Sequence, residues 1–250
     1  AARLALDWGY DEINLNVGCP SQRVQAGNFG ACLMADPDLV ARCVEAMGQA
    51  SALPVTVKHR IGIDELDNDT LLTAFVDRVA EAGAQRFSVH ARKAWLEGLD
   101  PKQNRTIPPL QHDRVVALKQ RRPELLIELN GGLETPADCL VALDECDGAM
   151  VGRAAYAHPL RWADMDHLIY GEAPRQLLAS DVVEGLIPHA AQHLHRGGRL
   201  WDLCRHLVQL VEGVPGARHW RRELGERSQR KGADLKILEE AGRQLKDAGL

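Results

Sequence analysis

Residues 12–151 alternate short runs rich in Val, Ile and Leu with longer amphipathic runs. The short runs are typical of buried strands, and the apolar residues of the longer runs recur at helical spacing. A strand–helix–strand order requires parallel strands joined by crossover helices, so the sequence predicts an α/β fold. The predicted strands are Glu12–Val17, Pro54–Arg60, Arg86–Arg92, Leu125–Asn130 and Gly148–Val151.

Capping signals predict where the intervening helices begin. Asp36 directly before Pro37 is typical of an N-cap followed by proline in the first helical turn, and the same signal recurs at residues 135–136. Two of the predicted helices begin at Pro37 and Pro136. Two more are predicted over Thr70–Ala82 and Val115–Arg121.

Polar residues lie at or just past the carboxyl ends of all five predicted strands. In a (β/α)8 TIM barrel those ends share the face that carries the active site, whereas an open doubly wound sheet concentrates its site at one switch point. The distribution therefore favours the barrel. A closed barrel needs about eight strands, so we expect the first three βα units to lie before Ala1, and the barrel here to be N-terminally incomplete. The polar residues are Asn16, Cys19, Lys58, Arg60, His90, Arg92, Asn130 and Arg153.

The pattern changes after Arg161, beyond which only helices are predicted. We expect a barrel domain over residues 1–170 and a small all-helical domain over residues 171–250, joined around Tyr170–Pro174. The helices predicted for the second domain are Val182–His195, Leu200–Glu212, Arg218–Leu224 and Ala233–Ala248.

Composition excludes several classes of protein. The six cysteines form no C-x-x-C pair and no zinc spacing, so no metal is expected. We expect them to be reduced thiols of a cytoplasmic protein. No apolar run is long enough to cross a bilayer, so no membrane partner is expected. The net charge of −5 does not point to nucleic acid, but a local basic face can coexist with an acidic body.

Ala217–Lys231 carries such a basic cluster, with six Lys or Arg against two Glu. Arg218, Arg221 and Arg222 share a helix face, and Trp220 lies among them in the sequence. A polyanion is expected to bind there; a solvated basic helix is the alternative.

Cys19 lies between Gly18 and Pro20, where a strand breaks into a loop on the expected catalytic face. A cysteine is most often a small buried hydrophobe, and that interpretation is kept for the other five cysteines. Its position makes Cys19 a candidate for catalysis.

Lys58 lies in the middle of an apolar strand, where a cation is costly to bury unless it is paired. One interpretation is an ion pair with Glu128. The other is a cation that faces an anionic cofactor, such as a reduced flavin, with His90 on the next strand facing the same group.

Glycine turns follow the last two predicted strands, at Asn130-Gly131-Gly132 and at Gly152-Arg153. Glycine lets backbone amides approach a phosphate, arginine supplies charge, and barrels often bind phosphate after their last strands. Ordinary surface turns are the alternative.

The long loop Lys93–His112 is the kind that is usually functional or disordered. Trp95, Lys102 and Arg105 would meet RNA by stacking and charge. The alternative is a solvated lid.

Several of these stretches together resemble the tRNA-dihydrouridine synthase family. They are YDEINLNVGCPSQRVQAGNFGACLM, VTVKHRIGID, ELNGGL and GAMVGRAAY. The stretch HARKAWLEGLDPKQNRTIPPL, with GARHWRREL near the end, is similar to the DusA-like branch, which modifies positions 20 and 20a of the tRNA D-loop.

This resemblance implies an oxidoreductase with an FMN-binding barrel and a helical tRNA-binding domain. NADPH would reduce FMN, which would deliver hydride to C6 of a flipped-out uracil, and Cys19 would protonate C5. A thiol acts as an acid only while protonated, and no cation adjoins Cys19 in the sequence. The implied FMN contacts are Lys58, His90, Asn130, Gly131, Gly132, Gly152 and Arg153, and the implied tRNA contacts are Asn16, Lys102, Arg105, Arg218 and Arg221.

The family's first strand, with Pro-Met, and a flavin-contacting Gln on its third strand have no counterpart here, so an N-terminally truncated copy is expected. A monomer is also expected. Two other functions remain open. One is an FMN barrel oxidoreductase acting on a small molecule, and the other is a non-catalytic tRNA-binding protein.

Overall fold

The computed structural model describes residues 1–213 and 216–250. The chain divides into two compact units, the first of residues 1–133 and 137–151 and the second of residues 134–136 and 152–250. The division at Val151 comes before the domain boundary expected at residue 170, so residues 152–170 group with the helical unit.

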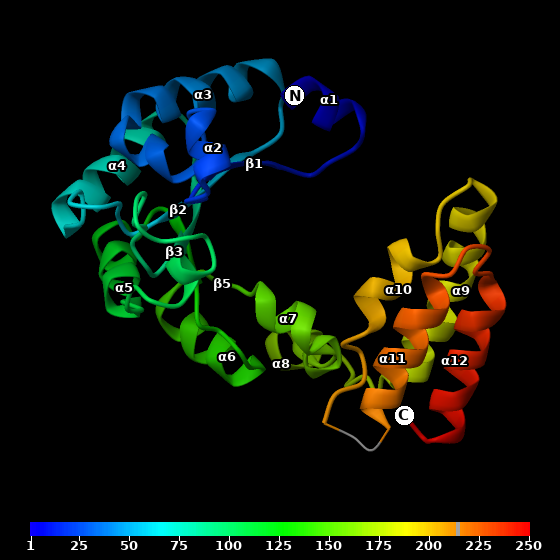
Figure 1. The fold of residues 1–250 in the computed structure, drawn as a ribbon. Coiled ribbons are helices and arrows are strands. Elements are labelled where there is room, and N and C mark those ends of the chain that lie inside the picture. Colours follow the sequence, from blue (N-terminus) through cyan, green and yellow to red (C-terminus); the bar gives the residue numbers. More distant parts are fainter. Residues whose placement is uncertain (214–215) are drawn as a thin grey trace. The chain divides into compact units, whose positions relative to one another are not determined.

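A five-stranded parallel sheet forms the centre of the first unit, with its strands in chain order (Figure 1). An order without reversal is that of a barrel, because a doubly wound sheet reverses at its switch point. All five predicted strands are confirmed. They are β1 (Ile13–Val17), β2 (Val55–Arg60), β3 (Arg86–His90), β4 (Leu126–Asn130) and β5 (Gly148–Met150).

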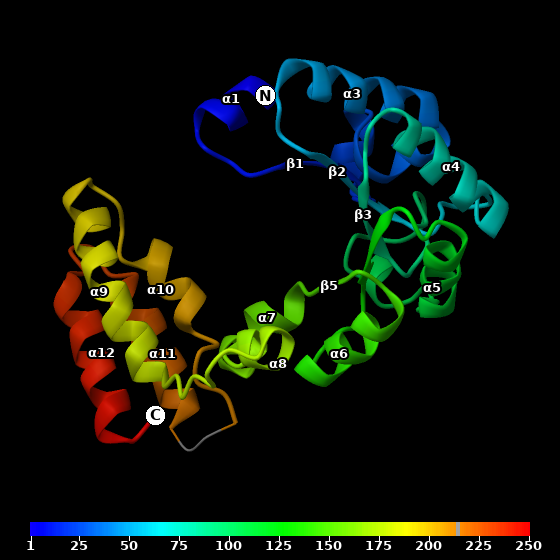
Figure 2. The ribbon, with the colours of Figure 1, turned by 180° about the vertical axis from the view of Figure 1, so that it is seen from behind.

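Helices α3 to α6 run along one side of this sheet (Figure 2). The predicted N-cap of α3 is confirmed, because Asp36 Oδ1 accepts a hydrogen bond of 3.0 Å from Leu39 N. Asn68 caps α4 in the same way, accepting from Leu71 N at 2.9 Å. The helical elements of the region are α1 (Ala2–Asp7), α2 (Gln22–Ala26), η1 (Gly30–Ala35), α3 (Pro37–Ala50), α4 (Asp69–Glu81), η2 (Gln103–Arg105), α5 (His112–Arg121) and α6 (Pro136–Glu145).

The two faces of the sheet differ in chemistry. Alternate residues of a strand point to opposite faces, and paired residues of parallel strands share a face. Val57, Phe87 and Ile127 occupy one face and are fully buried. The opposite face carries a polar layer made of Asn16, Lys58, Ser88 and Glu128, which are consecutive partners in the register.

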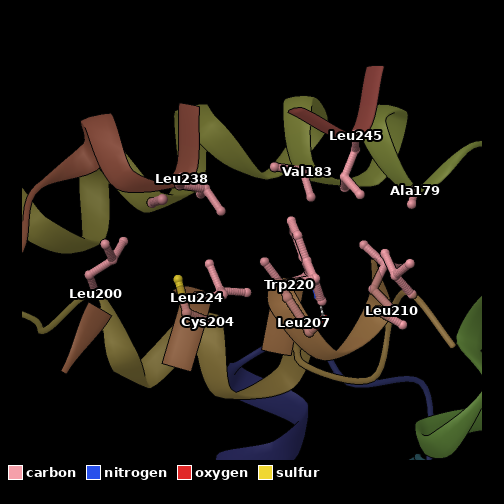
Figure 3. Close-up of a cluster of buried hydrophobic side chains, with 13 residues drawn as sticks. Ala179, Val183, Leu200, Cys204, Leu207, Leu210, Trp220, Leu224, Leu238 and Leu245 are labelled. Carbon is pink, nitrogen blue, oxygen red and sulfur yellow. Dashed lines mark hydrogen bonds between the residues drawn. The ribbon is translucent and has the colours of Figure 1, made fainter. Parts of the chain in front are cut away.

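The second unit is helical, and no strand occurs among its described residues. Side chains from α9 and α12 meet those from α10 and α11 in a common core that includes Val183, Trp220 and Leu238 (Figure 3). None of the helices described is long and apolar enough to cross a membrane. The elements are α7 (Arg153–Ala157), η3 (Pro159–Trp162), α8 (Met165–Tyr170), α9 (Ala179–His195), α10 (Trp201–Leu207), α11 (Ala217–Ser228) and α12 (Leu235–Asp247).

Helix α10 ends earlier than predicted, at Leu207 instead of Glu212. The carbonyl of Leu207 accepts a hydrogen bond from the indole Nε1 of Trp220 at 3.1 Å and another from Leu210 N at 2.9 Å. Tertiary contact thus satisfies the final carbonyl, and the helix stops without exposing it.

His59 is an unusual member of the apolar face, being fully buried between Phe75 and Phe87. Its Nδ1 lies 2.7 Å from the carbonyl oxygen of Arg60, while its Nε2 has no partner in the described part of the chain. Burial lowers the pKa of His59 to about 4, against the opposing effect of that hydrogen bond and with a smaller lowering by the charge of Lys58.

We predict that His59 weakens the fold in acid. In the unfolded chain a histidine has a pKa of about 6.5, so the unfolded state binds a proton below that pH while folded His59 stays neutral down to about 4. The free energy of unfolding is therefore at its highest above pH 6.5, as far as His59 is concerned, and falls by up to about 3 kcal/mol as the pH drops to 4. Urea unfolding of wild type and His59→Leu across this range measures the effect. The variant should lose that part of the slope, and equal slopes would contradict the assignment.

Candidate active site

Lys58 is half-buried on the polar face, between Asn16 of β1 and Ser88 of β3. Burial, and secondarily the charge of Arg60, lowers the pKa of Lys58. Its ammonium makes no hydrogen bond or ion pair with any described residue. The expected alternative partner, Glu128, instead accepts from Ser88 Oγ and pairs with Arg86 Nε at 3.5 Å. Lys58 is therefore a partly desolvated cation whose counter-charge is not supplied by the described chain.

Cys19 lies in the loop that follows β1, half-buried and with a free thiol. Asn16 Oδ1 accepts a hydrogen bond from Gly18 N at 3.0 Å, and the carbonyl of Cys19 accepts one from Ala31 N at 2.9 Å. Both bonds hold the loop beside the end of the strand. Gly30, at φ +73°, lets the returning chain pass close to the carbonyl of Cys19.

Arg60 is a buried arginine at the end of β2. Its Nε donates to the carbonyl of Gly18 at 2.9 Å, and its Nη1 donates to the carbonyls of Lys93 and Asn104, each at 3.1 Å. Burial lowers the pKa of Arg60 to about 10, so the group stays charged at neutral pH. Arg60 also interacts electrostatically with Cys19. The fold thus brings to the thiol a cation that is not its neighbour in the sequence.

His90 and Asn130 are partners in the register at the ends of β3 and β4. Asn130 Nδ2 donates to the carbonyl of Met150 at 2.6 Å. Gly131 and Gly132 follow with φ of +106° and +74°, which glycine adopts without strain. A Cβ added at Gly131 would lie 3.0 Å from the ring of His90, so the turn packs directly against that imidazole.

Gly152 and Arg153 lie in the second unit, where Gly152 is the N-cap residue of α7 and Arg153 its first residue. They therefore belong to a different unit from Lys58, His90 and the Asn130 turn, which lie toward the carboxyl ends of β2, β3 and β4 in the first.

The long loop after β3 is ordered by its own side chains. Asn104 is fully buried and hydrogen-bonded to the backbone of Trp95 through both its amide oxygen and its amide nitrogen. Lys102 and Arg105 are exposed. Trp95, expected to stack on RNA, is half-buried and has the ammonium of Lys93 3.9 Å from its ring centre, so one face of the indole is already occupied.

The basic cluster lies on α11. Arg218 is exposed and Arg221 half-exposed, and neither pairs with an acid within residues 1–213 and 216–250. Trp220 does not belong to their face: it is 7% exposed and lies in the helical core. Arg227 is neutralised by Glu240 at 2.6 Å, so the free positive charge gathers in the first turns of the helix.

Comparison with known proteins identifies the family to which these features belong. The model of a family described as dihydrouridine synthase (Dus) matches residues 1–247. The chain belongs to the dihydrouridine synthase family. Its members are oxidoreductases that act on tRNA.

Relatives place the chain within one branch of the dihydrouridine synthases. A tRNA-dihydrouridine(20/20a) synthase from Synechocystis sp. is 51% identical over 249 residues, which cover 100% of this chain and 72% of the relative. The protein of the same name from Shewanella oneidensis is 50% identical over 237 residues, or 95% of this chain and 71% of the relative. Among solved structures, a 2,3-dimethylmalate lyase matches 99% of this chain and 87% of its own at 12% identity and a TM-score of 0.48.

Sequence reasoning placed Arg60 on the expected catalytic face without a specific role, and gave no role to Asn104 or Gly30. Arg60 was open to detection, because Lys58 and Arg60 are two residues apart on a strand and must share the polar face. The roles of Asn104 and Gly30 depend on the folded shape of the loops that contain them, and no periodic or capping signal marks either residue.

Gly30→Ala is predicted to disturb the Cys19 loop. The new Cβ would lie 2.5 Å from the carbonyl oxygen of Cys19 and 2.8 Å from Val24 Cγ1, at a φ that alanine rarely adopts. We expect a loss of about 1–3 kcal/mol in the free energy of unfolding.

Gly48→Ala is the matched control, because Gly48 lies inside α3 with nothing within 4 Å of an added Cβ. It should stabilise the dihydrouridine synthase by up to about 1 kcal/mol. Urea unfolding of both variants tests the pair, and a neutral Gly30→Ala would contradict the close packing of the loop.

Proposed function

We propose that the chain forms 5,6-dihydrouridine at positions 20 and 20a of the tRNA D-loop, with FMN as cofactor and NADPH as reductant. Family membership and the names of the relatives support the reaction. The observation that carries the chemistry is the partly desolvated Lys58, on the strand next to the one that leads into the Cys19 loop. A cation without a protein counter-charge at that place favours a bound anionic group.

The residues at this end of the sheet fit FMN. Lys58 would supply positive charge to stabilise the negative charge that a reduced flavin gains, and His90 with Asn130 would add polar groups from the next strands. The Gly131–Gly132 turn lets main-chain amides approach a ligand closely. The family resemblance also assigns FMN contacts to Gly152 and Arg153. When bound and reduced, FMN supplies the hydride for C6 of the uracil.

Cys19 completes the reduction in this proposal by donating the proton of its thiol to C5. Fixing the donor in a defined geometry lowers the barrier, because little motion is left to restrict in the transition state. The bonds of the Cys19 carbonyl to Ala31 and of Gly18 to Asn16 and Arg60 provide that order. Asn16 Oδ1 is engaged within the loop, so its amide nitrogen is the group proposed to contact the RNA.

A uracil must leave its stack to reach such a site, so the RNA needs to be held on both sides of the target base. Lys102 and Arg105 are proposed to contact the tRNA near the catalytic loop. Arg218 and Arg221 supply unpaired positive charge on α11 of the helical unit. Those arginines favour RNA over a small-molecule substrate, while Lys58 and the ordered thiol favour an enzyme over a passive tRNA-binding protein.

Cys19→Ala tests the acid. We expect dihydrouridine formation in tRNA, measured by mass spectrometry, to fall by about 100-fold or more, because a positioned proton donor contributes 10²–10⁴-fold. The affinity for tRNA should stay close to that of wild type.

Cys32→Ala provides the control from the same segment, since Cys32 is also half-buried and its thiol bonds only within the loop, at 3.0 Å to the carbonyl of Phe29. It should retain activity. Full turnover by Cys19→Ala would remove Cys19 from the acid role.

The double variant Arg218→Glu and Arg221→Glu tests the helical RNA surface. Reversing two phosphate-facing charges should weaken tRNA binding by at least about tenfold and flatten its salt dependence. Filter binding at several salt concentrations measures both effects.

A second pair, Arg196→Glu with Arg199→Glu, makes the same change of charge in the exposed segment between α9 and α10. Equal losses from the two double variants would mean that net charge, and not the α11 surface, controls binding.

A further inference from the structure

The segment from Trp95 to Thr106, here called the docking turn, is built around one buried amide. Asn104 Oδ1 accepts from Trp95 N at 2.8 Å. Asn104 Nδ2 donates to the carbonyls of Trp95 at 2.9 Å and Leu99 at 3.2 Å, with a longer contact to that of Asp100. A fully buried amide whose donors and acceptor are all engaged fixes one loop conformation, since any other would strand polar groups.

A second set of bonds closes the tip of the docking turn. Asp100 Oδ1 accepts from the main-chain amides of Lys102 at 2.6 Å and Gln103 at 2.7 Å. Gln103 Oε1 accepts in return from Asp100 N at 2.8 Å. These bonds lock the backbone that carries Lys102 and Arg105, whose side chains remain exposed.

Arg60 ties the docking turn to the catalytic loop. One guanidinium donates both to the carbonyl of Asn104 and to the carbonyl of Gly18, the residue before Cys19. A single buried side chain, that of Arg60, therefore connects the loop that carries Lys102 and Arg105 to the loop that carries Cys19. A flap that closes on its ligand would leave these main-chain groups to solvent, whereas here their hydrogen bonds are made within the protein itself.

We propose that the docking turn is a pre-ordered RNA-binding element, and that Asn104 and Arg60 are positioning residues that set its distance from Cys19. The inference rests on the proposed action on tRNA. An element that is ordered by its own hydrogen bonds loses little conformational entropy when RNA binds, so the affinity is not reduced by that cost. The spacing between Lys102 and Arg105 on one side and Cys19 on the other then determines which nucleotide reaches the thiol when the backbone is gripped.

Asp100→Ala and Asp100→Asn separate order from charge. Both remove the same negative charge at an exposed position, but asparagine keeps the oxygen that accepts from Lys102 N and Gln103 N. We expect tRNA to bind Asp100→Ala several-fold more weakly than Asp100→Asn, although charge alone would make the two equal. Equal affinities would overturn the proposal.

Asn104→Ala is the stronger perturbation, and Asn68→Ala is its control. Asn68 caps α4 and makes no hydrogen bond with the docking turn in the described part of the chain, so its change to alanine is the same truncation with the loss of one hydrogen bond outside that segment. Asn104→Ala should speed amide hydrogen exchange over residues 95–106 and lower tRNA affinity about tenfold, since small displacements of a positioned group have large effects. Asn68→Ala should change neither.

Hydrogen exchange of the wild-type chain without RNA gives the decisive reading. Slow exchange across the docking turn, unchanged on addition of tRNA, supports the proposal. Exchange at unfolded-chain rates that slows only with tRNA would identify a closing flap and overturn it. If the wild-type chain makes no dihydrouridine, the proposed function is wrong. If it is active but Asp100→Ala and Asp100→Asn bind tRNA equally well, only the proposal for the docking turn is wrong.

Discussion

The buried guanidinium of Arg60 is the interaction on which the candidate site depends. A charge removed from water costs several kcal/mol unless hydrogen bonds replace its hydration. Three carbonyls do so here, from Gly18, Lys93 and Asn104. Each bond to a charged group contributes about 1.5–3 kcal/mol. If the loops after β1 and β3 moved apart, the buried guanidinium would lose hydrogen bonds that replace its hydration. Arg60 therefore holds the two loops together.

The sheet register puts Arg60 in that position. Lys58 and Arg60 face the polar side of the sheet because His59, between them, faces the apolar side. A slip of one residue in the pairing of β2 would place His59 toward the site and bury two cations under the helices. The burial of Val57 and the ring contacts of His59 with Phe75 and Phe87 therefore decide which residues form the opposite face.

Elements were predictable from the sequence because their causes are local. Strand composition, the cap at Asp36 and helical periodicity need only neighbouring residues. The network of the site needs contacts across long stretches of chain, such as that of Arg60 with Asn104, and no periodicity encodes it. Trp220 is instructive, because it lies two residues after Arg218 and so points to nearly the opposite side of the helix. The position of Trp220 in the core could therefore have been predicted from the sequence.

Net charge was uninformative about RNA because a sum over the whole chain does not say where its charges lie. Asp38, Asp69 and Asp77 pair with arginines of α4 and α5, linking the outer helices to one another. Each pair adds nothing to the net charge and little to the field at the catalytic end of the sheet, because its two charges cancel locally. What remains without an acidic partner in the described residues includes Lys58, Lys102, Arg218 and Arg221. The chain is acidic as a whole, but a polyanion responds to the local charge at such positions and not to the sum.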